Sequence, residues 1–411
     1  MDKPPDDDTC DVAIIGGGMV GASLACALSR LPLRVIMIET AAPQLGTPPT
    51  YDDRAIALSF GSRRILEGIG AWDHLASSAT PIERIHVSDR GRFGFTHLDC
   101  EEEGVPALGY VALARELGDA LYRTLGPTAV EQLAPAELES FHQDGDGVTL
   151  EVSTPDGRRS IHTRLVAAAD GTRSLVREQL RVPTREHDYQ QSAIITNVTP
   201  SRPHGNVAYE RFTESGPIAL LPMSENRCGL VWTWHADSTP EPLAWDDDTF
   251  LAHLQDAFGF RLGRLLRVGQ RFSYPLKLLM AQRAVHGRIA LIGNAMHTLH
   301  PVAGQGFNLG IRDVAALGDV VATALHGRQD PGAPAVLDAY ESWRRRDQEN
   351  LAVITDGLAR LFTNPLGPVR WGRNLGLLFT DLLPGARHGI ARHAMGLTGY
   401  LPRLSRGLRL D

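Results

Sequence analysis

The stretch DVAIIGGGMVGASLACALSRLPLRVIMIE, residues 11–39, decides the fold of this 411-residue chain. It predicts a strand, a helix and a second strand, over Val12–Ile15, Ala22–Leu28 and Arg34–Ile38. The two apolar runs are short and rich in β-branched residues, which is typical of parallel strands that are buried on both faces. The sequence therefore predicts an α/β fold that starts with a strand–helix–strand unit.

Three glycines in this unit follow the spacing GxGxxG, at Gly16, Gly18 and Gly21. Gly16 permits a tight turn, Gly18 lets a pyrophosphate approach the backbone, and Gly21 lets the helix pack closely on the strand. Glu39 ends the second run, 18 residues after Gly21, where its carboxylate can accept hydrogen bonds from a ribose. We expect a dinucleotide site here, although the motif alone does not separate FAD from NAD.

The same region contains an uncharged run, Val12–Ser29, whose length is close to that of a membrane span. It holds four glycines and follows acidic residues, whereas a signal peptide begins with basic residues and ends in a cleavage site. The dinucleotide-binding interpretation therefore explains this run better.

The bulk composition is that of an ordinary globular protein with two or three domains. A net charge of −7 argues against general nucleic-acid binding. The four cysteines are scattered and form no CxxC pair, so we expect free thiols and a cytoplasmic location. His297 and His300 have a spacing seen in metal sites, but no third ligand lies nearby, and we expect no metal.

Two further apolar runs end in polar turns. Residues 165–169 lead into Asp170-Gly171, and residues 289–292 lead into Gly293-Asn294. Open α/β sheets bind their ligands at the carboxyl ends of such strands. Both turns are therefore candidate parts of the same site.

The stretch HPVAGQGFNLGIRD, residues 300–313, places Gly304, Gly306 and Gly310 within seven residues. Glycine is costly to order, so this density indicates that something approaches the backbone closely. Apolar residues at helical spacing follow, at 311, 314, 317, 321 and 325. We expect a loop that leads into a helix N-terminus, which is a second site suited to an anion.

The order of these motifs resembles the single-component flavin-dependent aromatic hydroxylases, which have a p-hydroxybenzoate-hydroxylase-like fold. His300-Pro301, the GQG triplet, Asn308 and Asp313 resemble the ubiquinone-biosynthesis hydroxylases within that class. The segments DDRAIALSFGSRRILEGIGAW, HVSDRGRFGF and YERFTESGPIALLPMSENRCGLVW are most similar to the 2-polyprenyl-6-methoxyphenol hydroxylases. The resemblance extends from the first strand to about residue 350 and is weaker beyond.

The resemblance implies FAD as cofactor and NAD(P)H as co-substrate. Residues expected to bind the cofactor are Gly16, Gly18, Gly21, Glu39, Arg54, Arg115, Asp170, Gly171, Gly293, Asn294, Gly306, Phe307 and Asn308. Residues expected to face the reacting flavin ring are Pro301, Gly304, Gln305 and Gly306. Asn294 stands where the wider class has aspartate, which removes a charge but keeps a hydrogen-bond donor and an acceptor.

For the two arginines the interpretations stay open. Arg54 either lies near the flavin or forms a surface salt bridge. Arg115 either reaches the cofactor from a helix start or is a solvated helix residue.

The expected FAD domain is discontinuous and comprises residues 1–75, 101–185 and 283–345. Residues 76–100 and 186–282 contain strand-like segments such as SAIITNV, IALLPM and CGLVWTW, which predict a mostly antiparallel substrate domain. Residues 346–411 are expected to form a helical C-terminal region. Its part from 351 onward holds eight arginines and three aspartates, a net charge of +5. Such a tail either contacts the inner face of an anionic membrane, or a protein partner, or packs on the FAD domain.

The resemblance further implies the reaction: hydroxylation of a polyprenylated (methoxy)phenol with O2 and NAD(P)H, through a hydroperoxide at C4a of the flavin. No general base is identifiable from the sequence. Two alternatives remain, namely a flavin reductase or dehydrogenase on the same fold, and a flavin-stabilised scaffold subunit of a quinone-synthesis complex.

Overall fold

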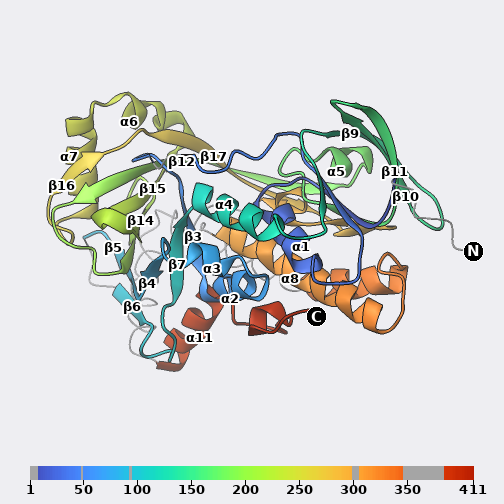
Figure 1. Cartoon of the computed structure of the whole chain (residues 1–411). Helices are drawn as coiled ribbons and strands as arrows, with labels where there is room; N and C mark the ends of the chain where they lie inside the picture. The colour runs from blue at the N-terminus through green and yellow to red at the C-terminus, as the bar shows by residue number, and fades with distance from the viewer. Residues whose placement is uncertain (1–7, 48–49, 92–94, 299–304, 346–383) are drawn as a thin grey trace, which may run out of the picture.

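The computed structural model of the chain describes residues 8–47, 50–91, 95–298, 305–345 and 384–411. Its strands form three sheets, with helices α1, α4 and α8 running between the two larger ones (Figure 1). One large sheet lies on the right of this view, with β9, β10 and β11 at its outer end, and the other lies on the left beneath α6 and α7.

The first sheet has a parallel centre. Its path is β18 (Val285–His286), β19 (Ile289–Leu291), β11 (Gly157–Ala168), β1 (Thr9–Ile15), β2 (Val35–Ile38) and β8 (Glu131–Leu133). The antiparallel strands β9 (Glu137–Gln143) and β10 (Val148–Thr154) extend from β11. β2, with the sequence VIMI, is buried throughout, because helices and strands cover both of its faces.

Helices cover this sheet. They are α1 (Met19–Leu28), α4 (Ala114–Leu125), α5 (Leu175–Gln179) and α8 (Gln305–His326), and residues 334–345 are also helical. α1 is buried over its whole length from Gly21 to Leu28, which explains why its sequence is uncharged. The run that resembles a membrane span therefore consists of most of β1, the glycine turn and the buried helix α1.

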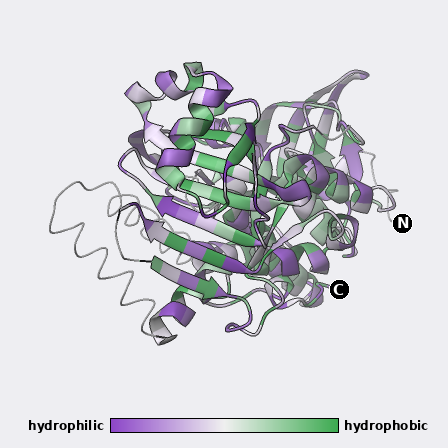
Figure 2. Ribbon diagram, turned by 90° about the vertical axis from the view of Figure 1, so that its left-hand side faces the viewer, coloured by the Kyte–Doolittle hydropathy of each residue, from purple (hydrophilic) through white to green (hydrophobic). Residues whose placement is uncertain are grey.

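The second sheet is antiparallel except for one strand pair, β13–β5. Its path is β20 (His297–Thr298), β17 (Phe272–Ala281), β12 (Thr184–Pro200), β15 (Arg227–His235), β14 (Pro217–Met223), β13 (Val207–Phe212), β5 (Arg84–Asp89) and β6 (Phe95–Asp99). β16 (Leu265–Val268) pairs with β12, and α6 (Pro240–Ala244) and α7 (Asp247–Phe258) accompany this sheet. Hydrophobic and hydrophilic residues mix along its strands (Figure 2).

A small sheet joins the two larger ones. It consists of β3 (Ala55–Ser59), β7 (Gly109–Leu113) and β4 (Thr80–Ile82). Helices α2 (Phe60–Gly68) and α3 (Trp72–Leu75) lie between β3 and β4 in the chain. Val111 and Leu113 of β7 pack against Ala208 and Met223 of the second sheet. This contact fixes the second sheet relative to the first.

The expected elements are present. The predicted strands and helix of residues 11–39 are β1, α1 and β2, and the predicted apolar runs at 165–169 and 289–292 end β11 and β19. SAIITNV, IALLPM and CGLVWTW lie in β12, β14 and β15, so the fold class is confirmed. All four cysteines are free and buried.

The described part of the C-terminal region packs on the rest of the chain. Ala391 and Met395, in and just after α11 (Pro384–Ala394), are buried against Phe60 and Leu98. The guanidinium of Arg403 donates to Asp319 of α8 at 2.6 Å, and Leu410 is buried in the main core. None of the helices that the structure describes combines the length and apolarity needed to cross a membrane.

Candidate functional site

Four of the five parallel strands of the first sheet, β19, β11, β1 and β2, end in one row. Ile15 pairs with both Ile38 and Ala168, and Ala168 pairs with Leu291. The backbone pairing continues one step further, since Gly16 donates to Ile38 O (2.8 Å) and Ala169 donates to Ile15 O (2.7 Å). The sequence motifs that follow these strands therefore meet at a single edge, as the rule for open α/β sheets predicts.

Two of the fingerprint glycines are required by the packing of the first turn. Gly16 has φ +101°, and a Cβ there would lie 2.5 Å from the carbonyl oxygen of Ala169. A Cβ at Gly21 would overlap the carbonyl oxygen of Gly16. Both positions exclude a side chain for reasons internal to the chain.

Gly18 is different, because a Cβ there would meet nothing within 4 Å and the residue is exposed. It is the N-cap of α1, no side chain caps this helix end, and its first turn contains no acidic residue. The first amides of a helix lack intrahelical partners and favour an anion. The packing of the protein thus leaves Gly18 free for a ligand.

Glu39 and Tyr122 hold the glycine turn from the side. Glu39 accepts a hydrogen bond from Gly17 N–H at 2.5 Å, and the hydroxyl of Tyr122 donates to Gly17 O at 2.8 Å. Burial, and then the charge of Glu39, raise the pKa of Tyr122 to about 12, so its hydroxyl stays protonated as a donor. The sequence did not identify Tyr122, which comes from α4, 105 residues away.

The turn after β11 presents a carboxylate with an unsatisfied oxygen. Asp170 Oδ2 accepts from Val176 N–H at 3.2 Å, whereas Oδ1 is buried and has no hydrogen-bond partner within the described residues. Gly171 has φ +80° with open space around it. A ligand hydroxyl can satisfy the free oxygen.

The turn after β19 is close to α1. Gly293 has φ +58°, and a Cβ there would be 3.0 Å from a methyl group of Val20. Gly310 of α8 packs on the same valine, with a would-be Cβ 2.9 Å from it. Asn294, in contrast, is exposed. Helix α8 and the turn at Gly293 therefore both pack on Val20 in the first turn of α1.

The two described glycines of this stretch, Gly306 and Gly310, differ in their surroundings. Gly310 is explained by its contact with Val20. At Gly306, in the first turn of α8, a would-be Cβ has no described residue within 4 Å. That turn contains no acidic residue. Phe307 packs partly buried against the main core. Pro301 and Gly304 lie outside the described residues, as does the side chain of Gln305.

The side chain of Asn308 is turned toward the small sheet. Its Oδ1 accepts from Ser59 N–H (2.8 Å) and Ser62 Oγ (2.7 Å), and its Nδ2 donates to Ala57 O (2.9 Å). The side chain fixes α8 against β3 and α2.

A buried ion cluster supports the same region. Asp313 is fully buried, 2.6 Å from His297 Nε2 and 2.7 Å from Arg344 Nε, and it also accepts from Gly293 N–H. Burial raises the pKa of Asp313, but His297, Arg344 and these hydrogen bonds lower it by more, so the net shift is downward. His297 is thus a buried hydrogen-bond partner of Asp313. Within the described residues no cluster suited to a metal ion occurs.

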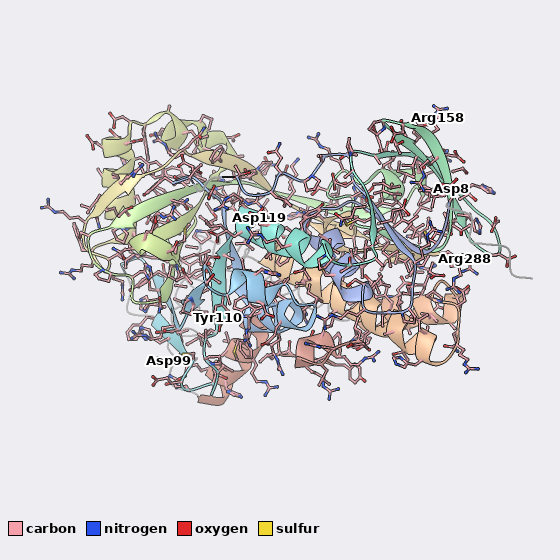
Figure 3. The ribbon with its side chains drawn as sticks, viewed as in Figure 1. Asp8, Asp99, Tyr110, Asp119, Arg158 and Arg288 are labelled. Carbon is pink, nitrogen blue, oxygen red and sulfur yellow. The ribbon has the colours of Figure 1, made fainter. Side chains whose placement is uncertain are left out.

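The two expected arginines differ in environment. Arg115, at the start of α4, is held by Asp53 at 3.2 Å, with Glu116 at 3.5 Å and Asp119 at 3.9 Å. Asp119 lies near the centre of the molecule (Figure 3). Arg54 is exposed, one residue after Asp53. The acidic partners of Arg115 were not identified from the sequence.

Beside the small sheet, one row of residues crosses the second sheet through directly paired positions. The inner row comprises Phe272, Ile195, Val231, Ala219, Glu210 and Val87. Phe272 is 39% exposed, and the other five are partly exposed. On the opposite face, Ile194, Ile218 and Trp232 are buried against α7. The inner row is therefore an apolar surface that the described residues leave partly uncovered.

The comparisons with known proteins agree with this geometry. A family model described as an FAD binding domain matches residues 9–353. The chain is 42% identical to a ubiquinone hydroxylase, UbiL, of Rhodospirillum rubrum, over 98% of this chain and 94% of that one. It belongs to the FAD-dependent hydroxylases of ubiquinone biosynthesis.

Other members of this family are more distant. The chain is 32% identical to the 3-demethoxyubiquinol 3-hydroxylase of Escherichia coli, over 94% of this chain and 98% of the relative. Among solved structures, p-nitrophenol 4-monooxygenase PnpA from Pseudomonas putida superposes with a TM-score of 0.78 at 21% identity, covering 95% of this chain and 99% of that one. This last likeness shows the shared fold.

The residues present fit FAD. The N-termini of α1 and α8 have no acidic residue in their first turns. Each has a glycine, Gly18 or Gly306, at which a Cβ would have no described residue within 4 Å. Asp170 contributes a buried oxygen that has no partner among the described residues, and Glu39 lies at the end of β2, where a ribose is expected. As an FAD-dependent hydroxylase, the protein uses NAD(P)H as reductant.

Proposed function

We propose that this FAD-dependent hydroxylase inserts one oxygen atom from O2 into the ring of a polyprenylated (methoxy)phenol. The overall reaction consumes one O2 and one NAD(P)H with a proton, and it yields the hydroxylated ring, NAD(P)+ and water. The observation that carries the proposal is the 42% identity, over nearly the whole chain, to a relative named ubiquinone hydroxylase.

Bound FAD would supply the activation of O2, and the protein supplies binding, orientation and exclusion of water. We assign the pyrophosphate to the N-terminus of α1 at Gly18 and the ribose to Glu39. Asn294 and Asp170 would bind the chain between the ribose and the ring. The amides of the first turn of α8, from Gln305 to Asn308, would stabilise negative charge on the reduced ring.

We assign the substrate to the inner row. Its residues are apolar except for Glu210, and an apolar surface of this kind suits a phenol that carries a prenyl chain. The row lies next to the small sheet, whose strand β3 is tied to the first turn of α8 through Asn308. A ring on this row would thus lie between the second sheet and the first turn of α8.

The proposal is tested with the purified holoenzyme, NAD(P)H and a short-chain prenylated phenol. We expect the phenol to stimulate NAD(P)H oxidation, and a hydroxylated product with one added oxygen to appear by mass spectrometry. NAD(P)H oxidation with another acceptor and no added oxygen would favour the reductase alternative. A flavin-binding but inactive variant that restores quinone synthesis in a deletion strain would favour the scaffold alternative.

We further propose that the basic C-terminal region contacts an anionic membrane while α11 packs on the protein. Arg392, Arg406 and Arg409 are exposed, as are Ile390, Tyr400 and Leu408, so charged and apolar side chains are accessible together. Replacing the three arginines with glutamate should reduce flotation with anionic vesicles, and wild-type flotation should weaken with salt. Equal flotation of both proteins would leave packing as the only role of this region.

A further inference from the structure

Glu210 is the one ionisable residue of the inner row. Directly paired positions place it between Ala219 of β14 and Val87 of β5, and the row continues through Val231 and Ile195. Its strand neighbours Ala208 and Phe212, which share its face, are buried. A carboxylate therefore lies in the middle of an apolar surface that the described residues leave partly uncovered.

This position is costly for a charged group. Burial alone raises the pKa of Glu210 to about 7, and no charge within the described residues contributes to the shift. β14 carries no ionisable residue, and the titratable group on the same side of β5 is Asp89, paired opposite Phe212. An ionisable group that has no ion pair among the described residues and lies on a partly uncovered apolar surface is a functional candidate.

We infer that Glu210 binds the phenolic hydroxyl of the substrate and accepts its proton when the ring is oxidised. The inference rests on the proposed function, since it needs a phenol on the inner row. It assigns the acid–base group that the sequence motifs did not reveal. Glu210 is then a catalytic residue, because it contacts the reacting phenol.

The proposed step transfers one proton from the substrate phenol to Glu210. The phenolic O–H bond breaks, its proton forms an O–H bond with a carboxylate oxygen of Glu210, and the electron pair stays on the phenol oxygen. The negative charge on the phenol oxygen makes the ortho and para carbons of the ring more electron-rich. These carbons then react more readily with the oxygen atom that is transferred. The oxygen atom and the two electrons come from O2 and NAD(P)H, and Glu210 later releases its proton to the product or to solvent. A base whose pKa is near the working pH is effective in such a transfer.

Binding is tested without turnover, using the oxidised holoenzyme and the absorbance change of its flavin. The probes are a prenylated phenol and its methyl ether, at pH 8. The wild type should prefer the phenol about tenfold or more, the size expected for one hydrogen bond to a charged group. Glu210→Leu, which matches the apolar row, should bind the two probes within twofold of each other. An undiminished preference in Glu210→Leu would overturn the assignment.

Turnover is tested with Glu210→Gln, Glu210→Asp and the control Glu214→Gln, which lies in the exposed turn of the same hairpin. Hydroxylation by Glu210→Gln should fall about 100-fold or more, the usual range for the loss of a general base. Glu210→Asp should retain more activity, and Glu214→Gln should match the wild type. Wild-type hydroxylation should rise with pH through about 7, and Glu210→Gln should lose that inflection.

Different results would overturn the role of Glu210 and the proposed hydroxylation. Hydroxylation by the wild type together with an equal rate and inflection in Glu210→Gln would overturn the role of Glu210 alone. Absence of hydroxylated product from the wild type, in a protein with full FAD occupancy, would overturn the proposed function and the inference with it.

Discussion

His297 Nε2 and Asp313 Oδ2 lie 2.6 Å apart, and both side chains are completely buried. Asp313 also binds Arg344 and the backbone of Gly293, so one carboxylate connects α8, the helical residues 334–345 and the turn after β19. That turn carries the expected cofactor residues Gly293 and Asn294. The cluster is therefore expected to set both the stability and the geometry of this part of the site.

Asp313→Asn should destabilise the fold by about 3–5 kcal/mol, because the buried Arg344 loses its counter-charge. Asp319→Asn, on the same helix but paired with the partly exposed Arg403, should cost about 1 kcal/mol. The free energy of unfolding in urea measures both. A loss in Asp313→Asn no larger than in Asp319→Asn would contradict this account.

The same residue gives a pH dependence. The pKa of Asp313 is lower in the folded protein than its ordinary value of 3.8. The ionised carboxylate therefore contributes stability that is present above about pH 4 and is lost as the pH falls below that value. The free energy of unfolding of Asp313→Asn, measured in urea, should therefore fall less than that of the wild type as the pH is lowered below about 4.

Gly18→Val and Gly21→Ala should separate cofactor binding from folding. A Cβ at Gly18 meets no described atom within 4 Å, so Gly18→Val should fold normally but lose FAD. Gly21→Ala places a methyl group on the carbonyl of Gly16 and should lower stability instead. FAD occupancy and apoprotein unfolding are the two measurements, and full FAD occupancy in Gly18→Val would show that the site is misassigned.

Asn294 is exposed, so substitutions there should change FAD affinity with little effect on folding. Asn294→Asp introduces the residue of the wider class and should still bind FAD. Asn294→Ala removes the hydrogen-bonding groups and should weaken binding by about 1 kcal/mol, or roughly fivefold. Titration of the apoproteins with FAD checks this, and weaker binding by Asn294→Asp than by Asn294→Ala would argue against the assigned contact.

Gly306→Val should lower phenol hydroxylation much more than NAD(P)H oxidation, with the excess released as hydrogen peroxide. No described residue lies within 4 Å of a Cβ placed at Gly306, and productive transfer needs an aligned phenol and exclusion of water. Gly310→Ala is the matched control, because its methyl group meets Val20 and should affect stability rather than coupling. Unchanged coupling in a flavin-replete Gly306→Val protein would assign Gly306 to chain folding only.

Local patterns predicted much of the fold. The apolar runs and the glycine spacing of residues 11–39 are local patterns, so they predicted β1, α1 and β2. They also predicted that Glu39 directly follows β2. The turns at Asp170 and Gly293 follow from the same rule, because parallel strands end at one edge. The family resemblance predicted the cofactor, and the family match confirms it.

Contacts between distant segments were not predictable. Tyr122 reaches Gly17 across 105 residues, and Asn308 is turned to Ser59 and Ser62, about 250 residues away. The sequence gives no strand register, and only the register places Glu210 beside Val87 and Ala219. These positions depend on tertiary pairing rather than on local periodicity.

The central claim, oxygen insertion into a phenol, is tested most directly with isotopically labelled O2. The holoenzyme is given 18O2, NAD(P)H and a prenylated phenol in unlabelled water, and the product is examined by mass spectrometry. The account predicts one 18O atom in each hydroxylated product, and water as the source of none. NAD(P)H oxidation by the FAD-loaded enzyme with no labelled product, or a product oxygen that comes from water, would contradict it.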